Sequence, residues 1–64
     1  MAEANYIKVD DNGDECVAVY DAHETEHFAL WYSDYGSKGR ARVAATELAQ
    51  ELAQKLGCEW GTNW

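Results

Sequence analysis

Two stretches rich in hydrophobic residues, 5–11 and 14–21, occupy the first third of the chain and predict β-strands. Asn12-Gly13 separates them. This dipeptide favours a tight hairpin, because Asn and Gly tolerate the positive φ that both central residues of a type I′ turn adopt. A two-residue turn predicts these cross-strand pairs: Val9 with Cys16, Ile7 with Ala18, and Asp10 with Glu15.

The predicted register leaves apolar side chains on both faces of the hairpin. One face is expected to carry Ile7, Val9, Cys16, Ala18 and Tyr20. The opposite face is expected to carry Tyr6, Lys8, Val17 and Val19. A third strand is predicted at 27–33, where apolar residues occupy positions of both parities. The connection that precedes this strand sets its register, so the pattern leaves open which parity joins which face.

From residue 39 to residue 56 the apolar period changes to that of an α-helix. The predicted apolar stripe consists of Ala41, Ala44, Ala45, Leu48, Ala49, Leu52 and Leu56. Ser37 precedes this helix as an N-cap residue, and Gly57 follows it as a C-cap residue. A short tail at 57–64 contains Trp60 and Trp64, which could act as lids over an edge of the core.

These elements predict an α+β fold in one domain that spans residues 1–64, with the order βββα. A three-stranded antiparallel meander would carry one C-terminal helix on one of its faces. The uncovered face would then expose a patch of Tyr, Trp and Val, which is typical of a surface for a partner or a second copy. In the alternative arrangement, Trp60 and Trp64 fold back over this face. The sequence leaves both arrangements open.

Length and charge narrow the function classes further. The 64 residues include 12 acidic and 5 basic side chains, for a formal charge of −7. So short a chain buries only one small core, which excludes a large enzyme with a deep pocket. The charge argues against direct binding to nucleic acid or to an anionic membrane and favours basic partners. The acidity belongs to residues 1–34, where nine acids and one lysine give −8, whereas three acids and four bases give 35–64 a charge of +1.

Targeting signals and cysteines bear on the compartment. No apolar stretch approaches the roughly 20 residues that span a bilayer, and the first residues lack the basic and apolar regions of a secretory signal. We therefore expect an intracellular protein. Cys16 and Cys58 are expected to be reduced, since a bridge between them would require an oxidising compartment.

One motif matches a catalytic pattern. His23-Glu24-Thr25-Glu26-His27 has the letters of the H-E-x-x-H motif of zinc metallopeptidases, in which a helix places both histidines on one face. Here the letters fall in a predicted connection between strands, and 64 residues leave little room for a further ligand and a substrate cleft. We interpret the match as coincidental, with adventitious metal binding as the weaker alternative. No catalytic residue, metal or cofactor is predicted.

A basic cluster opens the predicted helix. Lys38, Arg40 and Arg42 follow Gly36 and Ser37, where backbone amides could meet an anion. This stretch resembles the last helix of double-stranded RNA-binding domains. The first helix of that domain has no counterpart here, and the acidic half would repel phosphates, so direct nucleic-acid binding is not expected.

The acidic surface is the remaining candidate site. Its carboxylates are Asp10, Asp11, Asp14, Glu15, Asp21, Glu24, Glu26 and Asp34. Carboxylates on a rigid scaffold can enter a basic channel that binds phosphates, and long-range attraction steers them there. Aromatic residues, among them Tyr6, Tyr20, Trp31, Tyr32 and Tyr35, would anchor such an interface, and Tyr32 and Tyr35 are included in the predicted site. The alternative is a solvated face that only keeps a small protein soluble.

As a whole, the chain resembles the small acidic phage-encoded anti-CRISPR proteins, in particular inhibitors of type I systems that form Cascade. The resemblance rests on size, acidity, the lack of catalytic signatures and the sheet-plus-helix layout, and carries no motif from which residue roles transfer. It implies a non-enzymatic inhibitor in the host bacterial cytoplasm. Such an inhibitor binds a CRISPR effector subunit and blocks target DNA recognition or nuclease recruitment. The alternative is a small homodimeric regulatory module, similar to an antitoxin, that uses the open sheet face. The protein is expected to be a monomer or a weak homodimer.

Overall fold

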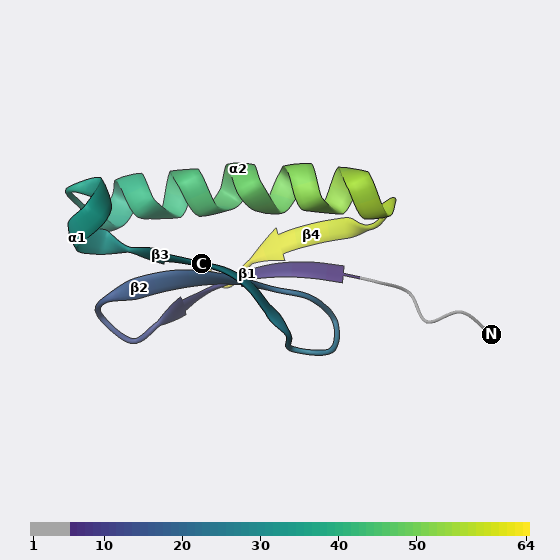
Figure 1. Cartoon of the computed structure of the whole chain (residues 1–64), viewed down its shortest axis with the longest axis horizontal. Helices are drawn as coiled ribbons and strands as arrows, with labels where there is room; N and C mark the ends of the chain where they lie inside the picture. Colours follow the sequence, from purple (N-terminus) through teal and green to yellow (C-terminus); the bar gives the residue numbers. More distant parts are fainter. Residues whose placement is uncertain (1–5) are drawn as a thin grey trace.

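The computed structural model describes residues 6–64 and has a mixed sheet with one long helix across it (Figure 1). Its elements are β1 (Tyr6–Asn12), β2 (Cys16–Tyr20), β3 (Glu26–Trp31), α1 (Tyr32–Tyr35), α2 (Lys38–Leu56) and β4 (Glu59–Thr62). The strand order is β3-β2-β1-β4. The α+β class with one main helix is confirmed, and so are three antiparallel strands, β1, β2 and β3. The sheet differs from the expected one in its fourth strand, β4, which pairs parallel to β1. Asn5, the expected start of the first strand, lies outside the described residues.

The hairpin between β1 and β2 has a different register from the predicted one. Asn12 pairs with Cys16, so residues 13–15 form the turn, and Gly13 has a φ of 77°. Val9 consequently lies opposite Val19, not opposite Cys16. Because side chains alternate across a strand, this odd shift turns all of β2 over. Val17 and Val19 join Ile7 and Val9 on one face, so the predicted faces are wrong. The predicted cross-strand pairs are wrong as well: the structure pairs Lys8 with Tyr20, Asp10 with Ala18, and Asp11 with Val17.

The third strand is shorter than predicted and leads directly into α1. It ends at Trp31, and the backbone amide of Tyr32 donates to the Glu15 carbonyl at 2.9 Å as the chain leaves the sheet. Near its start, the pairing with β2 shifts between Val19 and Tyr20, which marks a bulge. Beyond this bulge β3 is regular, with Phe28 opposite Val19 and Leu30 opposite Val17.

Both predicted caps of the long helix are confirmed. The Ser37 hydroxyl accepts from the Arg40 amide at 3.2 Å, and Gly57 takes the left-handed conformation with a φ of 68°. The buried stripe consists of Ala41, Ala45, Ala49 and Ala53. Ala53 was not in the predicted stripe, and Leu56, which was, is 47% exposed. Alanine on this face lets the helix backbone lie close to the sheet.

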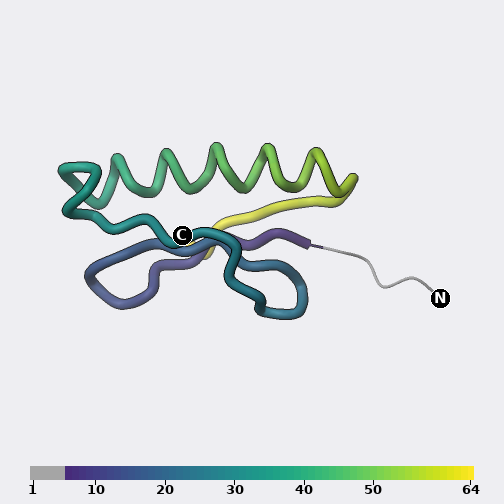
Figure 2. The backbone as a smooth tube through the Cα atoms, viewed as in Figure 1, coloured from purple at the N-terminus to yellow at the C-terminus, as the bar shows by residue number. Residues whose placement is uncertain are grey.

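The tail forms β4 instead of a lid. After Gly57, the amide of Cys58 donates to the Ala53 carbonyl at 2.9 Å, and the chain returns beneath α2 alongside β1 (Figure 2). β3, α2 and β4 thus make a split crossover unit, in which β2 and β1 lie between two parallel strands. Cys16 and Cys58 are both free thiols.

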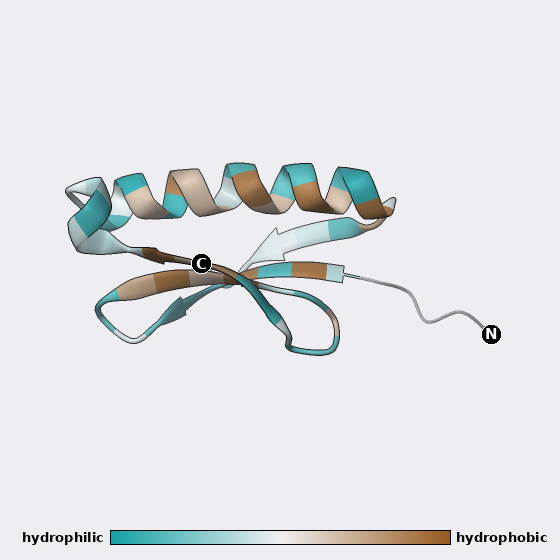
Figure 3. Cartoon of the chain, viewed as in Figure 1, coloured by the Kyte–Doolittle hydropathy of each residue, from teal (hydrophilic) through white to brown (hydrophobic). Residues whose placement is uncertain are grey.

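The sheet has one covered face and one open face. The covered face packs Ile7, Val9, Val17, Val19 and Leu30 against the alanine stripe. Figure 3 shows the hydrophobic segments of the strands and of α2 in brown. The open face carries Tyr6, Lys8, Asp10, Tyr20 and Trp31, by the strand pairing. The expected patch of Tyr, Trp and Val is therefore wrong for the valines, which lie on the covered face. The tail tryptophans do not cover the open face either: Trp60 shares the side of Ile7, with which it is paired, and the Trp64 ring lies 4.5 Å from the Arg42 guanidinium.

Candidate interaction surface

Asp11 is half-buried and is held by residues of both helices. It lies near the end of β1, and its carboxylate accepts from the Tyr32 hydroxyl at 2.7 Å. The same carboxylate forms an ion pair with Arg42, whose Nε lies 3.3 Å from Oδ1. Lys38 Nζ is 4.0 Å from the other oxygen, Oδ2. Arg42 also stacks on the Trp64 ring, so this cluster links β1, both helices and the tail.

The contacts within this cluster shift the pKa values of Asp11, Tyr32 and Arg42. The hydrogen bond from Arg42 holds the pKa of Asp11 below its ordinary value, and the Tyr32 hydroxyl adds to the effect. Desolvation and the neighbouring Asp11 carboxylate raise the pKa of Tyr32 to about 12. The Asp11 hydrogen bond raises the pKa of Arg42. Asp11 and Tyr32, both predicted as partner-binding residues, are therefore already engaged within the fold.

The loop between β2 and β3 uses its acids to hold its own shape. Asp21 Oδ1 accepts from the backbone amides of His23 at 2.9 Å and Thr25 at 3.0 Å. His27 Nε2 lies 3.1 Å from Asp21 Oδ2. The Thr25 amide, followed by His27, lowers the pKa of Asp21. The residues of the H-E-x-x-H pattern thus lie in this loop and at the start of β3, not on a helix.

Glu24 ties the same loop to the open face. Its backbone has a φ of 64°, in the left-handed region, and its carboxylate is 2.5 Å from Lys8 Nζ. The Lys8 hydrogen bond lowers the pKa of Glu24, and that of Lys8 is raised in return. Within residues 6–64, no group of three or more His, Cys, Asp or Glu side chains is placed to hold a metal ion.

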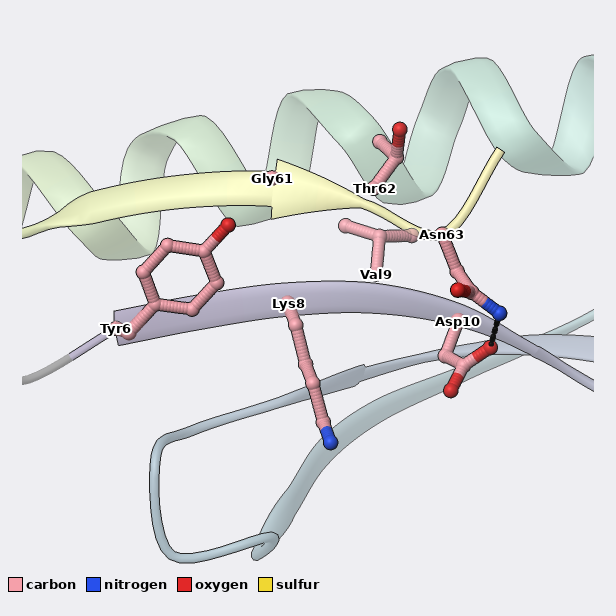
Figure 4. A pocket seen from close by; sticks show the side chains of 7 residues that line it. All are labelled: Tyr6, Lys8, Val9, Asp10, Gly61, Thr62 and Asn63. Carbon is pink, nitrogen blue, oxygen red and sulfur yellow. Dashed lines mark hydrogen bonds between the residues drawn. The ribbon is translucent and has the colours of Figure 1, made fainter.

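A shallow polar hollow of about 260 Å³ lies between β1 and β4, at the β4 edge of the sheet (Figure 4). Tyr6 lies at one end of it, next to β4, and its hydroxyl occupies the space where a side chain at position 61 would stand. At the other end Asp10 accepts a hydrogen bond from Asn63 Nδ2 at 2.7 Å. The sequence did not point to Gly61 or Asn63, because the tail showed no strand pattern that would place them beside β1.

The remaining predicted acids are free of such contacts. Asp14, Glu15, Glu26 and Asp34 are exposed, and in the described part of the chain none of their side chains has an ion-pair or hydrogen-bond partner. Glu26 begins β3 at the loop end of the sheet. The other three lie at the opposite end, where the β1–β2 turn and α1 come together (Figure 1).

Two exposed aromatic residues accompany these three acids. Trp31 is 47% exposed and pairs with Cys16, directly after the turn, and Tyr35 is 39% exposed in α1. We call the set of Asp14, Glu15, Trp31, Asp34 and Tyr35 the hairpin-end surface. The predicted site is thus divided: its hairpin and α1 members share one end, whereas Asp21, Glu24 and Glu26 lie at the other and Asp10 lies between them.

No protein-family model matches the chain, and neither a curated protein nor a solved structure matches it. Among the described residues, no helix is long and apolar enough to cross a membrane.

Proposed function

We propose that this protein is a non-enzymatic inhibitor that binds a basic, nucleic-acid-handling protein through its hairpin-end surface. The observation that carries the proposal is the contrast among the acids. Asp11, Asp21 and Glu24 are engaged within the fold, whereas Asp14, Glu15 and Asp34 are exposed and unpaired in the described chain. Unpaired carboxylates keep their charge available for a basic partner.

The aromatic residues add the second part of the argument. Interfaces are anchored by large side chains that lose water on binding, and Trp and Tyr are the residue types most often found in that role. Trp31 and Tyr35 provide two such side chains beside the acids. Charge would steer the encounter, and the aromatic rings would hold the complex once it has formed.

The partner class follows from the resemblance to type I anti-CRISPR proteins. In this proposal the carboxylates enter a basic channel of a Cascade-type effector in the cytoplasm of a bacterial host. They occupy the place of DNA phosphates there, and so block target recognition or nuclease recruitment. The activity requires no cofactor and no catalytic residue of this chain. Lys38 and Arg40, exposed at the start of α2, add positive charge next to the acids.

A charge-reversal experiment tests this surface. We expect the triple variant Asp14→Lys, Glu15→Lys, Asp34→Lys to bind a purified type I effector complex at least about tenfold more weakly than the parent protein. The matched control is Glu47→Lys, Glu51→Lys, Glu59→Lys, which changes the net charge equally at exposed sites elsewhere. It should retain binding, and raised salt should weaken binding of the parent. Equal loss in both triples would contradict the surface, and lack of binding to effector complexes would contradict the partner class.

A homodimeric, antitoxin-like module is the second candidate. The exposed Tyr6 and Trp31 on the open face, at 41% and 47%, favour it. Between them, however, stand Lys8 with its Glu24 partner and Asp10, which a face-to-face dimer would have to desolvate. Sedimentation equilibrium of a Tyr6→Glu variant separates the two candidates, because a dimer through this face would be lost.

A further inference from the structure

Asn12 and Gly13 form the entry to the turn between β1 and β2. Asn12 is the last residue of β1, and Gly13 begins the turn that joins it to Cys16. Both Asn12 and Gly13 are exposed. Gly13 has a φ of 77°, and nothing lies within 4 Å of the place where a Cβ would stand. A glycine has no side chain to shield its backbone nitrogen, and here no neighbouring segment fills that space either.

Hydrogen bonds hold the base of this turn but not its entry. Asn12 pairs with Cys16 at the end of the ladder, and Gly13 lies outside the ladder. Within residues 6–64, neither the backbone amide of Gly13 nor the side chain of Asn12 has a hydrogen-bond partner. A change of conformation at Gly13 therefore breaks no hydrogen bond of the fold.

We propose that Asn12-Gly13 is a site of spontaneous modification, at which Asn12 loses its side-chain amide. The backbone nitrogen of Gly13 attacks Cγ of Asn12: the N–Cγ bond forms, the Cγ–Nδ2 bond breaks, and the proton of the Gly13 amide leaves with ammonia. Water then opens the resulting cyclic imide. Opening at one carbonyl gives aspartate, and opening at the other gives isoaspartate, in which the main chain runs through Cβ. The reaction consumes water alone, without an oxidant or a reductant.

Asn63, the other asparagine that the structure describes, lacks these features. Its Nδ2 donates to Asp10 at 2.7 Å, and its backbone amide donates to the Val9 carbonyl at 2.9 Å. The attacking nitrogen would be that of Trp64, whose large side chain hinders ring closure. Loss of the amide would also leave a carboxylate at position 63 against that of Asp10, and like charges at this distance repel each other. The structure thus distinguishes Asn12 from Asn63.

The modification changes the hairpin end in charge and in backbone. Either product adds a carboxylate to the turn that carries Asp14 and Glu15, and makes the formal charge one unit more negative than −7. Asn12, Cys16 and Trp31 are paired across the sheet, so the new charge lies on the face that carries Trp31. Isoaspartate also lengthens the main chain at the pair with Cys16, where the turn is closed. Aspartate should therefore leave the hairpin intact, whereas isoaspartate should loosen it. The inference does not rest on the proposed function.

Trypsin separates the asparagines for a test by mass spectrometry. Cleavage after lysine and arginine places Asn12 in peptide 9–38, Asn5 in peptide 1–8 and Asn63 in peptide 56–64. We expect the folded parent protein, kept warm in mildly alkaline buffer, to gain aspartate and isoaspartate in peptide 9–38 at least about tenfold faster than in the other two. Isoaspartate identifies the imide, because direct hydrolysis of the side chain gives aspartate alone.

Two matched glycine variants link the reaction to Gly13. Gly13→Ala adds a methyl group beside the attacking nitrogen and should slow the reaction by about tenfold or more. The control is Gly36→Ala: this glycine has a φ of 86° and nothing within 4 Å of an added Cβ, but no asparagine precedes it. The control should react as the parent does, and circular dichroism verifies the fold of both variants. Asn12→Gln leaves the turn glycine in place and should give no product, because its imide would need a larger ring.

Three results would overturn the proposal. They are the absence of isoaspartate from peptide 9–38, equal rates in the three peptides, and a Gly13→Ala variant that reacts as fast as the parent. The chain unfolded in urea gives the reference for the turn. A folded chain that reacts more than about tenfold more slowly than the unfolded one would show that the pairing of Asn12 with Cys16 locks the turn, and would overturn the proposal as well.

Discussion

The covered and open faces of the sheet are built from the same strands and have opposite properties. Ile7 and Val9 have no exposed surface beneath α2, whereas Lys8 and Asp10, which alternate with them, form ion pairs and hydrogen bonds on the open side. Since successive side chains of a strand point to opposite faces, a chain of 64 residues can place its core and its solvent-facing groups within one strand. Substitutions at adjacent positions should therefore have very different effects.

The largest expected effect comes from the covered face. Ile7→Ala should destabilise the fold by about 2–5 kcal/mol, because it removes buried apolar surface and leaves a cavity. A domain of this length has roughly 3–10 kcal/mol of stability in total, so much of the chain would unfold. Lys8→Ala, one position along on the open face, should change little. Urea denaturation followed by circular dichroism measures both, and similar losses would contradict the division between the faces.

The helix side of the same interface should resist added volume. Ala49 is fully buried in the alanine stripe, which lets α2 lie close to the sheet. Ala49→Leu should push the two layers apart at a cost of about 1–3 kcal/mol, which lowers the thermal midpoint by about 5–20 °C in a domain of this size. The control Gln50→Leu adds the same side chain at an exposed position and should leave the midpoint nearly unchanged. A stabilised Ala49→Leu variant would show that the layers are loosely packed.

Signals within a short stretch of sequence predicted the helix well. They failed for the hairpin register and for β4, which depend on pairing between strands that are distant in the sequence. The period of the apolar residues and the caps Ser37 and Gly57 lie within the helix region itself. The hairpin register depended on whether the turn has two or three residues, and the strand pairing that places Val17 and Val19 under the helix settled it. β4 has four residues and no alternating pattern, and it exists because β1 offers a free edge.

The sequence predicted which acidic residues belong to the candidate site, but not which of their carboxylates are free to bind a partner. The sequence identifies each acid, yet the partner of Asp11 is Arg42, which is 31 residues away. Glu24 and Lys8 are likewise 16 residues apart. Only the folded chain separates these paired acids from Asp14, Glu15 and Asp34, which is why the predicted site was broader than the hairpin-end surface.

Asp11 lies at the rim of the covered face, and its ion pair should make the stability of the protein depend on pH. The pKa of its carboxyl is lowered in the folded protein, so its contribution to stability is present above its ordinary value of 3.8 and is lost as pH falls through the lower folded pKa. At neutral pH the parent protein should therefore melt at a higher temperature than the Asp11→Asn variant. This difference in melting temperature should disappear in acid. Asp14→Asn, at an exposed position without a partner in the described chain, should show no such gap. Melting curves from neutral to acidic pH measure this, and a gap that stays constant would contradict the ion pair.

The smallest expected effect concerns the open face, where Gly61 leaves room for Tyr6. A Cβ at position 61 would clash with the Tyr6 hydroxyl, which is the far end of a flexible side chain, so the ring can move aside. Gly61→Ala should therefore cost about 1 kcal/mol or less, since the lower entropy of the unfolded chain offsets part of the loss. In a Tyr6→Ala background the obstacle is gone, and the same substitution should be neutral or stabilising.

Gly39→Ala in α2, where nothing lies within 4 Å of the added atom, is the control and should stabilise in either background. Thermal melts of this double-mutant cycle give the coupling between positions 6 and 61. Zero coupling would mean that the tyrosine ring does not lie over β4, and that the hollow on the open face is wider than its present lining of Tyr6, Gly61 and Asn63 makes it.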